Sequence, residues 1–201
     1  MYELTNNQRK CFGLLPVDRN WTRMELQPGP YDHHITISYL DGTVLRKYIE
    51  TGGNEYTEYE ICERLSDDLQ YLLPKTKKGK PALLSAATLK RRTGLGMCLS
   101  YIRHNNGYFY IDIFNHNTQK SYYTNDYEHV RSYGMYDFQR WVESWCNETT
   151  EDDLTDISLF SAQPRQHIKF QEGDVFRFKI NRRLYGYGRI LLDYTHKKKK
   201  N

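Results

Sequence analysis

The sequence contains no run of apolar residues that approaches the length of a membrane span. A transmembrane helix needs about 20 predominantly apolar residues in succession. Residues 1–10 also lack the apolar stretch that marks a secretory signal peptide. We therefore expect a soluble protein that stays in the cytoplasm and has no membrane partner.

Cysteine is scarce, and the side chains that commonly bind metals are scattered. The chain has no Cys-x-x-Cys pair, which disfavours a zinc site and a dense disulfide framework, so we expect reduced and mostly buried thiols. The adjacent His33 and His34 would point to opposite sides of a strand. Three further histidines match no ligand spacing: His104, His116 and His129. No metal site is predicted. The cysteines are Cys11, Cys62, Cys98 and Cys146.

The motifs of common catalytic and cofactor sites are also missing. There is no Gly-x-Ser-x-Gly and no P-loop, and residues 93–96 lack the third glycine and the following helix of a dinucleotide fingerprint. The acidic pairs at 67–68 and 152–153 are better explained by solvated helix starts than by acid–base catalysis, because neighbours on a helix diverge. We therefore predict no enzyme activity, no catalytic residue and no cofactor.

The chain does have enough apolar and aromatic material for a folded core. Its 201 residues are 38% hydrophobic and 14% aromatic, which argues against global disorder. The net charge of +4 is unevenly divided: residues 161–201 hold 11 Lys/Arg and 3 Asp/Glu, a balance of +8, whereas residues 1–160 hold 18 and 22, a balance of −4. The basic character belongs to the C-terminal part, where the lysines at 197–200 are typical of a solvated end.

Hydrophobic periodicity predicts several strands and two short helices before residue 125. Residues 32–50 read as a β-hairpin with Asp41-Gly42 as its turn. Spaced apolar residues among charges predict a short helix within residues 56–73, and another is expected over 85–92. Three strands should follow, the first two joined by a turn at residues 105–107. They span residues 97–103, 108–114 and 119–124.

Two longer helices are expected next. Four large apolar residues fall at helical spacing and predict a helix that packs on the sheet. They are Phe138, Trp141, Val142 and Trp145. Thr150, with Asp153 three positions later, has the form of a capping box and predicts the start of a second helix, which Pro164 should end. Residues 1–160 are therefore predicted to form an α+β domain, an antiparallel sheet with packed helices, followed by a linker at 161–167.

The clearest hairpin lies near the C-terminus. Phe176, Phe178 and Ile180 alternate with basic residues, residues 181–183 provide the turn, and the return strand starts at Leu184. An isolated hairpin is marginal in water. We therefore expect the two strands of this hairpin to need further partners.

Two segments of this hairpin region carry a family resemblance. Residues 170–176 read Phe-Gln-Glu-Gly-Asp-Val-Phe, and residues 183–191 read Arg-Leu-Tyr-Gly-Tyr-Gly-Arg-Ile-Leu. A Gly-Asp pair followed by apolar residues and then a Tyr-Gly-Tyr-Gly-Arg strand resembles the opening of the immunity protein 26 family of bacterial polymorphic toxin systems. The resemblance implies a mostly β domain that neutralises a toxin. It covers residues 168–194, so we expect a domain truncated by a shifted reading frame and a disordered basic tail at 195–201.

The residues of the resemblance also have a physical interpretation. The glycines leave room for a ring or a backbone to approach closely, and the aspartate can hold a turn through nearby amides. The structural motif consists of Gly173, Asp174, Gly186 and Gly188. Large aromatic and arginine side chains suit protein interfaces. The candidate partner-binding residues are Tyr185, Tyr187 and Arg189, which share one face, together with Arg182 and Arg183.

The leading hypothesis is an immunity protein that binds and neutralises a cognate toxin protein. The alternative is a nucleic-acid-binding protein that uses the basic C-terminal segment, with further cations at 75–80 and 90–92. No nucleic-acid motif accompanies these cations, and solvated surfaces are the commoner explanation, so nucleic acid is not the expected partner. A hydrolase with a concealed site is a third reading.

Overall fold

The computed structural model describes residues 2–26, 28, 34–103, 109–124, 134–167 and 169–191. Among these residues the helices are α1 (Asn6–Cys11), α2 (Ala86–Leu89), α3 (Met135–Asn147) and α4 (Glu151–Ser161). The strands are β1 (Thr22–Leu26), β2 (Ile35–Asp41), β3 (Val44–Gly52), β4 (Glu55–Arg64), β5 (Tyr71–Leu72), β6 (Ala82–Leu83), β7 (Leu95–Arg103), β8 (Phe109–Asn115), β9 (Lys120–Thr124), β10 (Val175–Lys179) and β11 (Tyr185–Arg189).

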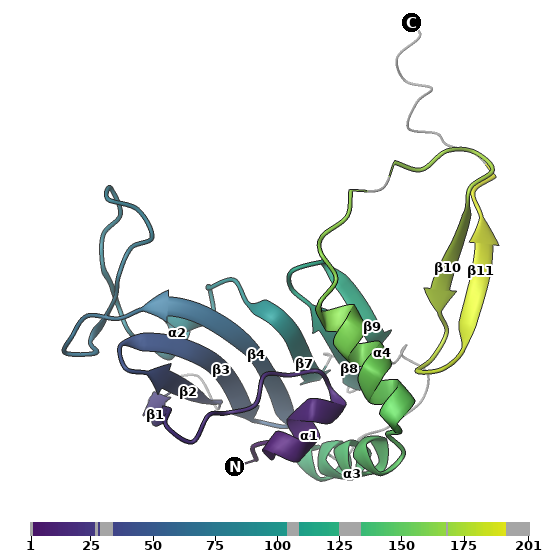
Figure 1. The fold of residues 1–201 in the computed structure, drawn as a ribbon. Helices are drawn as coiled ribbons and strands as arrows, with labels where there is room; N and C mark the ends of the chain where they lie inside the picture. The colour runs from purple at the N-terminus through teal and green to yellow at the C-terminus, as the bar shows by residue number, and fades with distance from the viewer. Residues whose placement is uncertain are drawn as a thin grey trace, which may run out of the picture.

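The largest element is a seven-stranded antiparallel sheet with the strand order β1-β2-β3-β4-β7-β8-β9 (Figure 1). Each strand pairs with its neighbour in the chain, except that the β5–β6 ribbon and α2 intervene between β4 and β7. Strands β1 and β9 form the two edges. An antiparallel sheet with separate helices defines an α+β fold, as predicted from the sequence.

Helices α1, α3 and α4 contribute to the hydrophobic cluster on one face of the sheet. Phe138 of the predicted aromatic stripe is fully buried and Trp145 is nearly so. Phe12 stacks against both Trp141 and Trp145, with ring centroids 5.6 and 5.9 Å apart. The Trp145 indole N–H also donates to the carbonyl of Cys11 at 3.0 Å, which joins α3 to α1. The prediction that this stripe packs against the sheet is therefore confirmed.

The other face of the sheet carries a second hydrophobic cluster. Tyr48 of β3 and Tyr59 of β4 pack with ring centroids 5.0 Å apart. Leu72 of β5 and Leu89 of α2 are fully buried in the same cluster. The ribbon and the short helix between β4 and β7 therefore cover part of this face.

A charged cluster is buried beneath α1. Glu58 of β4 is fully buried and accepts hydrogen bonds from Arg9 and from Lys47, each at 2.7 Å. The hydroxyl of Tyr56 donates to the same carboxylate. Burial by itself would raise the pKa of Glu58, but the two cations hold this pKa below its ordinary value. Removing one member would leave a buried charge without compensation, which is strongly destabilising.

The predicted helix within residues 56–73 is wrong, because the first half of this segment belongs to β4. This strand pairs with β3 and β7 in the middle of the sheet and is covered on both faces. Glu58 and Glu63 occupy buried positions where apolar residues would mark a strand. Because these two residues are charged, the sequence lacks the apolar run of a buried strand. In the structure their charges are compensated by ion pairs with cations from other segments. The 32–50 hairpin is confirmed, although its turn falls at residues 42–43 because Asp41 still belongs to β2.

The remaining predicted elements agree with the structure. Strands β7, β8 and β9 occupy the three predicted strand positions, while the turn at 105–107 lies outside the described residues. The short helix expected over 85–92 is α2. Helix α4 begins at the predicted capping box of Thr150 and Asp153 and ends at Ser161, shortly before the proline expected to end it.

No helix in the described part of the chain is long and apolar enough to cross a membrane. All four cysteines are free, and the expectation of mostly buried thiols holds in part, because Cys98 is buried but Cys62 is exposed. No group of three His, Cys, Asp or Glu side chains within the described ranges could hold a metal ion. Some residues discussed from the sequence lie outside the described residues: His33, His104, His129 and the lysines at 197–200.

Candidate protein-binding site at the C-terminal hairpin

Strands β10 and β11 pair antiparallel as a separate two-stranded sheet. On one face of this hairpin, Phe176 lies opposite Gly188 and Phe178 lies opposite Gly186. A Cβ atom at either glycine would collide with the facing ring. The two rings therefore rest directly on glycine backbone, which accounts for glycine at both positions.

The predicted Gly-Asp turn closes the open end of the hairpin. The Asp174 carboxylate accepts a hydrogen bond from the backbone N–H of Gln171 at 2.8 Å. Gly173 has a φ of +96°, and its N–H donates to the carbonyl of Ile190 at 2.7 Å. The Arg189 side chain donates to the Gly173 carbonyl at 3.1 Å. Gly173, Asp174 and Arg189 thus hold the end of the hairpin together.

The turn at the other end of the hairpin docks where α3 meets α4. The Arg182 guanidinium lies over the Trp145 ring, 4.1 Å from its centroid. It also donates to the Trp145 carbonyl at 3.0 Å and to the Thr149 hydroxyl at 2.6 Å. Stacking and directed hydrogen bonds at the same time require the planar guanidinium of arginine.

Arg183 adds a two-pronged ion pair with Asp153. Its Nε and Nη2 donate to the two carboxylate oxygens at 3.1 and 2.5 Å, and Nη2 also donates to the Glu148 carbonyl at 2.6 Å. The Arg183 hydrogen bonds hold the pKa of Asp153 well below its ordinary value. The same carboxylate accepts the Thr150 backbone N–H at 2.9 Å. Asp153 therefore both caps α4 and anchors the hairpin.

The structure gives Arg182 and Arg183 a role that was not predicted. Both side chains contact the α3–α4 corner and anchor the hairpin. Their contact with a partner stays a prediction. Sequence reasoning found the capping role of Asp153 but not its partner. No local pattern links residues 153 and 183, because they lie 30 positions apart.

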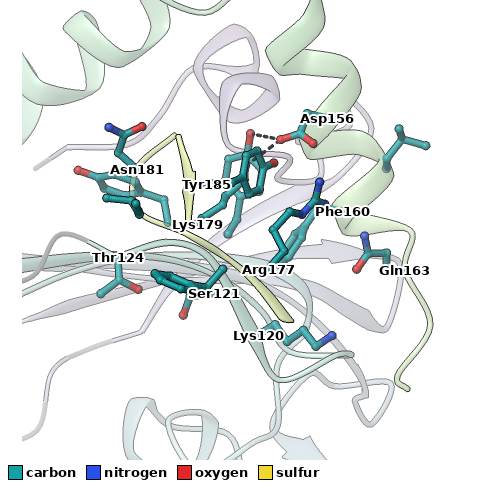
Figure 2. A pocket seen from close by; sticks show the side chains of 15 residues that line it. Lys120, Ser121, Thr124, Asp156, Phe160, Gln163, Arg177, Lys179, Asn181 and Tyr185 are labelled. Atoms are coloured by element: carbon teal, nitrogen blue, oxygen red, sulfur yellow. Dashed lines mark hydrogen bonds and ion pairs between the residues drawn. The ribbon is translucent and has the colours of Figure 1, made fainter. Parts of the chain in front are cut away.

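A cleft of about 670 Å³ lies between β9, α4 and the hairpin (Figure 2). Its β9 wall includes Lys120, and its hairpin wall includes Arg177 and Tyr185. Its lining residues come from these three regions and from the segment just after α4: Lys120, Ser121, Tyr122, Tyr123, Thr124, Asp156, Leu159, Phe160, Gln163, Arg177, Phe178, Lys179, Ile180, Asn181 and Tyr185. We call this space the β9–β10 cleft.

One carboxylate, Asp156 of α4, contributes to the lining of the cleft. It accepts hydrogen bonds from Lys179 at 2.8 Å and from the Tyr122 hydroxyl at 2.9 Å (Figure 2). Burial opposes ionisation, but these bonds and nearby cations keep the pKa of Asp156 below its ordinary value. The Lys179 ammonium also lies over the Tyr122 ring, 3.4 Å from its centroid. The Asp156 carboxylate is thus already hydrogen-bonded within the protein.

The hairpin exposes much of its apolar surface. Among the described residues, eight of the fourteen exposed large hydrophobic side chains lie between residues 170 and 191. They are Phe170, Val175, Phe176, Phe178, Ile180, Leu184, Tyr187 and Leu191. Tyr187 and Leu191 are 72% and 78% exposed. A concentration of this kind on one element is typical of an interaction surface.

The candidate residues therefore fall into three groups. Tyr185 lines the cleft, under Arg177 at 4.3 Å from its ring centroid, whereas Tyr187 is directed to solvent. Arg189 holds the open end of the hairpin, and the two tip arginines hold the other end. Sequence reasoning missed Lys120 and Asp156 as site residues, because only the fold brings β9 and α4 to the hairpin.

No family model, no curated protein and no solved structure matches the chain.

Proposed function

We propose that this protein acts by binding another protein through its C-terminal hairpin. The observation that carries the proposal is the concentration of exposed apolar side chains on residues 170–191. Burial of large exposed side chains such as Tyr187 and Leu191 against a partner lowers the free energy and so favours binding. Aromatic and arginine side chains on the same element suit the centre of a protein interface.

The anchoring of the hairpin supports the same function. Arg182 and Arg183 fix its turn to the α3–α4 corner, and Gly173 with Arg189 closes its far end. A binding element that is ordered before association loses less conformational entropy when the partner arrives. The exposed apolar side chains of the hairpin are thus held in a fixed position before the partner binds.

The partner that we propose is a toxin protein of a bacterial polymorphic toxin system. This proposal comes from the resemblance of residues 170–176 and 183–191 to the immunity protein 26 family. Neutralisation requires only that the bound protein covers a surface the toxin needs, so it needs no catalytic group. The cytoplasm is the compartment that we propose for this encounter.

The charge arrangement favours a protein over a nucleic acid as the partner. Lys179 pairs with Asp156, and the two tip arginines pair with Asp153, so these cations of the hairpin are already compensated within the chain. A phosphate backbone is bound by cations that are free to displace its counterions. The hairpin instead offers apolar side chains beside these compensated charges.

The proposal can be tested by co-expressing the protein with a toxin domain encoded beside its gene. We expect protection of growth and co-purification of the two chains. Tyr187→Ser combined with Leu191→Ser should weaken the complex at least tenfold, because both side chains are largely exposed and would enter the interface. Isothermal titration with the purified toxin domain measures the change.

A matched control removes one tyrosine and one leucine elsewhere. Tyr71→Ser with Leu83→Ser changes exposed residues of the β5–β6 ribbon and should leave the affinity unchanged. Full affinity in the hairpin variant, or equal weakening by the ribbon variant, would contradict the assignment of the interface to the hairpin.

A further inference from the structure

We infer that the β9–β10 cleft accepts an extended acidic segment of the partner protein, which adds as a strand along β9. The inference rests on the proposed function and specifies which part of the partner is recognised. Three observations support it: the position of β9 in the sheet, the charge of the cleft walls, and the rings that line them.

The first observation is the free edge of the large sheet. β9 is the last strand in the sheet order and pairs with β8 on one side. In the described part of the chain no strand pairs with its other side, and the hairpin across the cleft forms a sheet of its own. An edge strand presents backbone N–H and C=O groups that an extended peptide can pair with. The five residues of β9 would match a segment of roughly 17 Å.

The second observation is the charge of the walls. Lys120 of β9 and Arg177 of β10 line the cleft, and neither forms an ion pair with a carboxylate of the described residues. The single acidic residue of the lining, Asp156, is already engaged by Lys179 and Tyr122. A carboxylate entering between the two walls would therefore meet two cations that no ion pair among the described residues holds, with Arg177 resting on the Tyr185 ring. This complementarity selects acidic segments and disfavours basic ones.

The third observation is the aromatic lining. Tyr123 of β9, Phe160 of α4 and Tyr185 of β11 contribute rings to the cleft (Figure 2 shows Phe160 and Tyr185). A strand presents alternate side chains to opposite sides. A segment that alternates acidic with apolar residues could place its carboxylates near the cations and its apolar side chains against these rings. Backbone pairing would supply affinity, and the lining would supply selectivity.

The test uses synthetic eight-residue peptides carrying a fluorescent label. One alternates glutamate with valine, and a matched peptide alternates lysine with valine. Fluorescence anisotropy with the whole protein should show binding of the acidic peptide and at least tenfold weaker binding of the basic one. Lys120→Glu combined with Arg177→Glu should reduce binding of the acidic peptide at least tenfold. The single variant Arg177→Gln should reduce it by a smaller factor.

The control reverses two cations outside the cleft. Lys77→Glu with Lys78→Glu makes the same change in net charge on the exposed loop between β5 and β6 and should leave peptide affinity nearly unchanged. Circular dichroism and thermal unfolding of all variants check that the fold is retained. Hydrogen exchange should also show the amides of β9 becoming protected when the acidic peptide is added, since strand addition covers them.

Several outcomes would overturn the inference. Equal binding of both peptides, equal loss in the control variant, or unchanged exchange of β9 amides would each exclude acidic strand addition. Tighter binding of an oligothymidylate of the same charge would assign the cleft to single-stranded nucleic acid. If the peptides fail but the toxin complex still depends on Tyr187 and Leu191, the inference fails and the proposed function stands.

Discussion

The body of the protein and its C-terminal hairpin are held together in different ways. In the body, apolar side chains are buried on both faces of the large sheet, and Phe138 and Leu99 have no exposed surface. In the hairpin, no described residue from 169 to 191 is buried. The hairpin is instead attached by arginine side chains at its tip. Hydrophobic burial thus stabilises one region, and directed polar contacts position the other.

This difference separates folding from binding. A region with few buried apolar contacts opens at lower free energy than a core, and binding elements are commonly drawn from such regions. The hairpin can keep its apolar side chains exposed because the core of the body does not depend on them. Loss of hairpin contacts should therefore affect recognition more than global stability.

The largest expected effect is a difference in the free energy of unfolding between a phenylalanine variant in the body and one in the hairpin. Phe138→Ala removes a fully buried ring from the body core and should reduce the free energy of unfolding by about 3–5 kcal/mol. Phe178→Ala removes a ring that is 48% exposed and should cost much less. Urea unfolding of both variants checks this order. Equal losses would show that the hairpin belongs to the same cooperative unit.

An intermediate effect is expected at the hairpin tip. Arg182→Ala removes the stacking on Trp145 and the hydrogen bond to Thr149. Amides of β10 and β11 should then exchange faster, while those of β7 and β8 keep their protection, because the body core is untouched. Hydrogen exchange by mass spectrometry resolves the two regions. Arg165→Ala, on the exposed segment after α4, is the control and should change neither.

The smallest expected effect is the pH dependence of hairpin docking, which tests whether the Arg183–Asp153 ion pair anchors the hairpin. Arg183 lowers the pKa of Asp153 in the docked state, so the undocked chain takes up a proton at higher pH. Docking is therefore fully favoured above the ordinary aspartate pKa of about 3.9 and weakens as pH falls from there towards the lowered value. Asp153→Asn should dock less well at neutral pH and lose most of this dependence, and the remainder comes from Asp156, which pairs with Lys179 of the hairpin.

The Trp145 indole N–H resonance reports the docked state, because Arg182 lies over this ring. Titrating the protein from pH 6 to about pH 2 should shift this resonance below about pH 4, and the Asp153→Asn variant should show a clearly smaller shift. A variant that titrates like the unaltered protein would mean that another group controls docking.

Elements whose cause lies in neighbouring residues could be predicted from the sequence. The capping box of Thr150 and Asp153 and the apolar stripe around Phe138 act within one or two helical turns. Alternation likewise predicted the hairpins, because side-chain direction in a strand follows a period of two. The fold class followed from these local elements.

β4 could not be predicted in this way. Its buried Glu58 is compensated by Arg9, 49 positions away, and by Lys47 on the neighbouring strand. In the local sequence alone, these charges indicate an exposed helix. Burial of a charge depends on the geometry of several elements at once, which a local pattern does not contain.

By itself, the sequence determined strands β2, β3 and β7 to β11, the two longer helices and the clustering of aromatic and glycine residues in the hairpin. The tertiary structure decided how those residues are used. It turned Arg182 and Arg183 towards Asp153 and Trp145, and it placed Lys120 of β9 across a cleft from Arg177. Local elements follow from interactions between near neighbours in the chain. A site assembled from β9, α4 and a hairpin exists only after the core has brought these distant segments together.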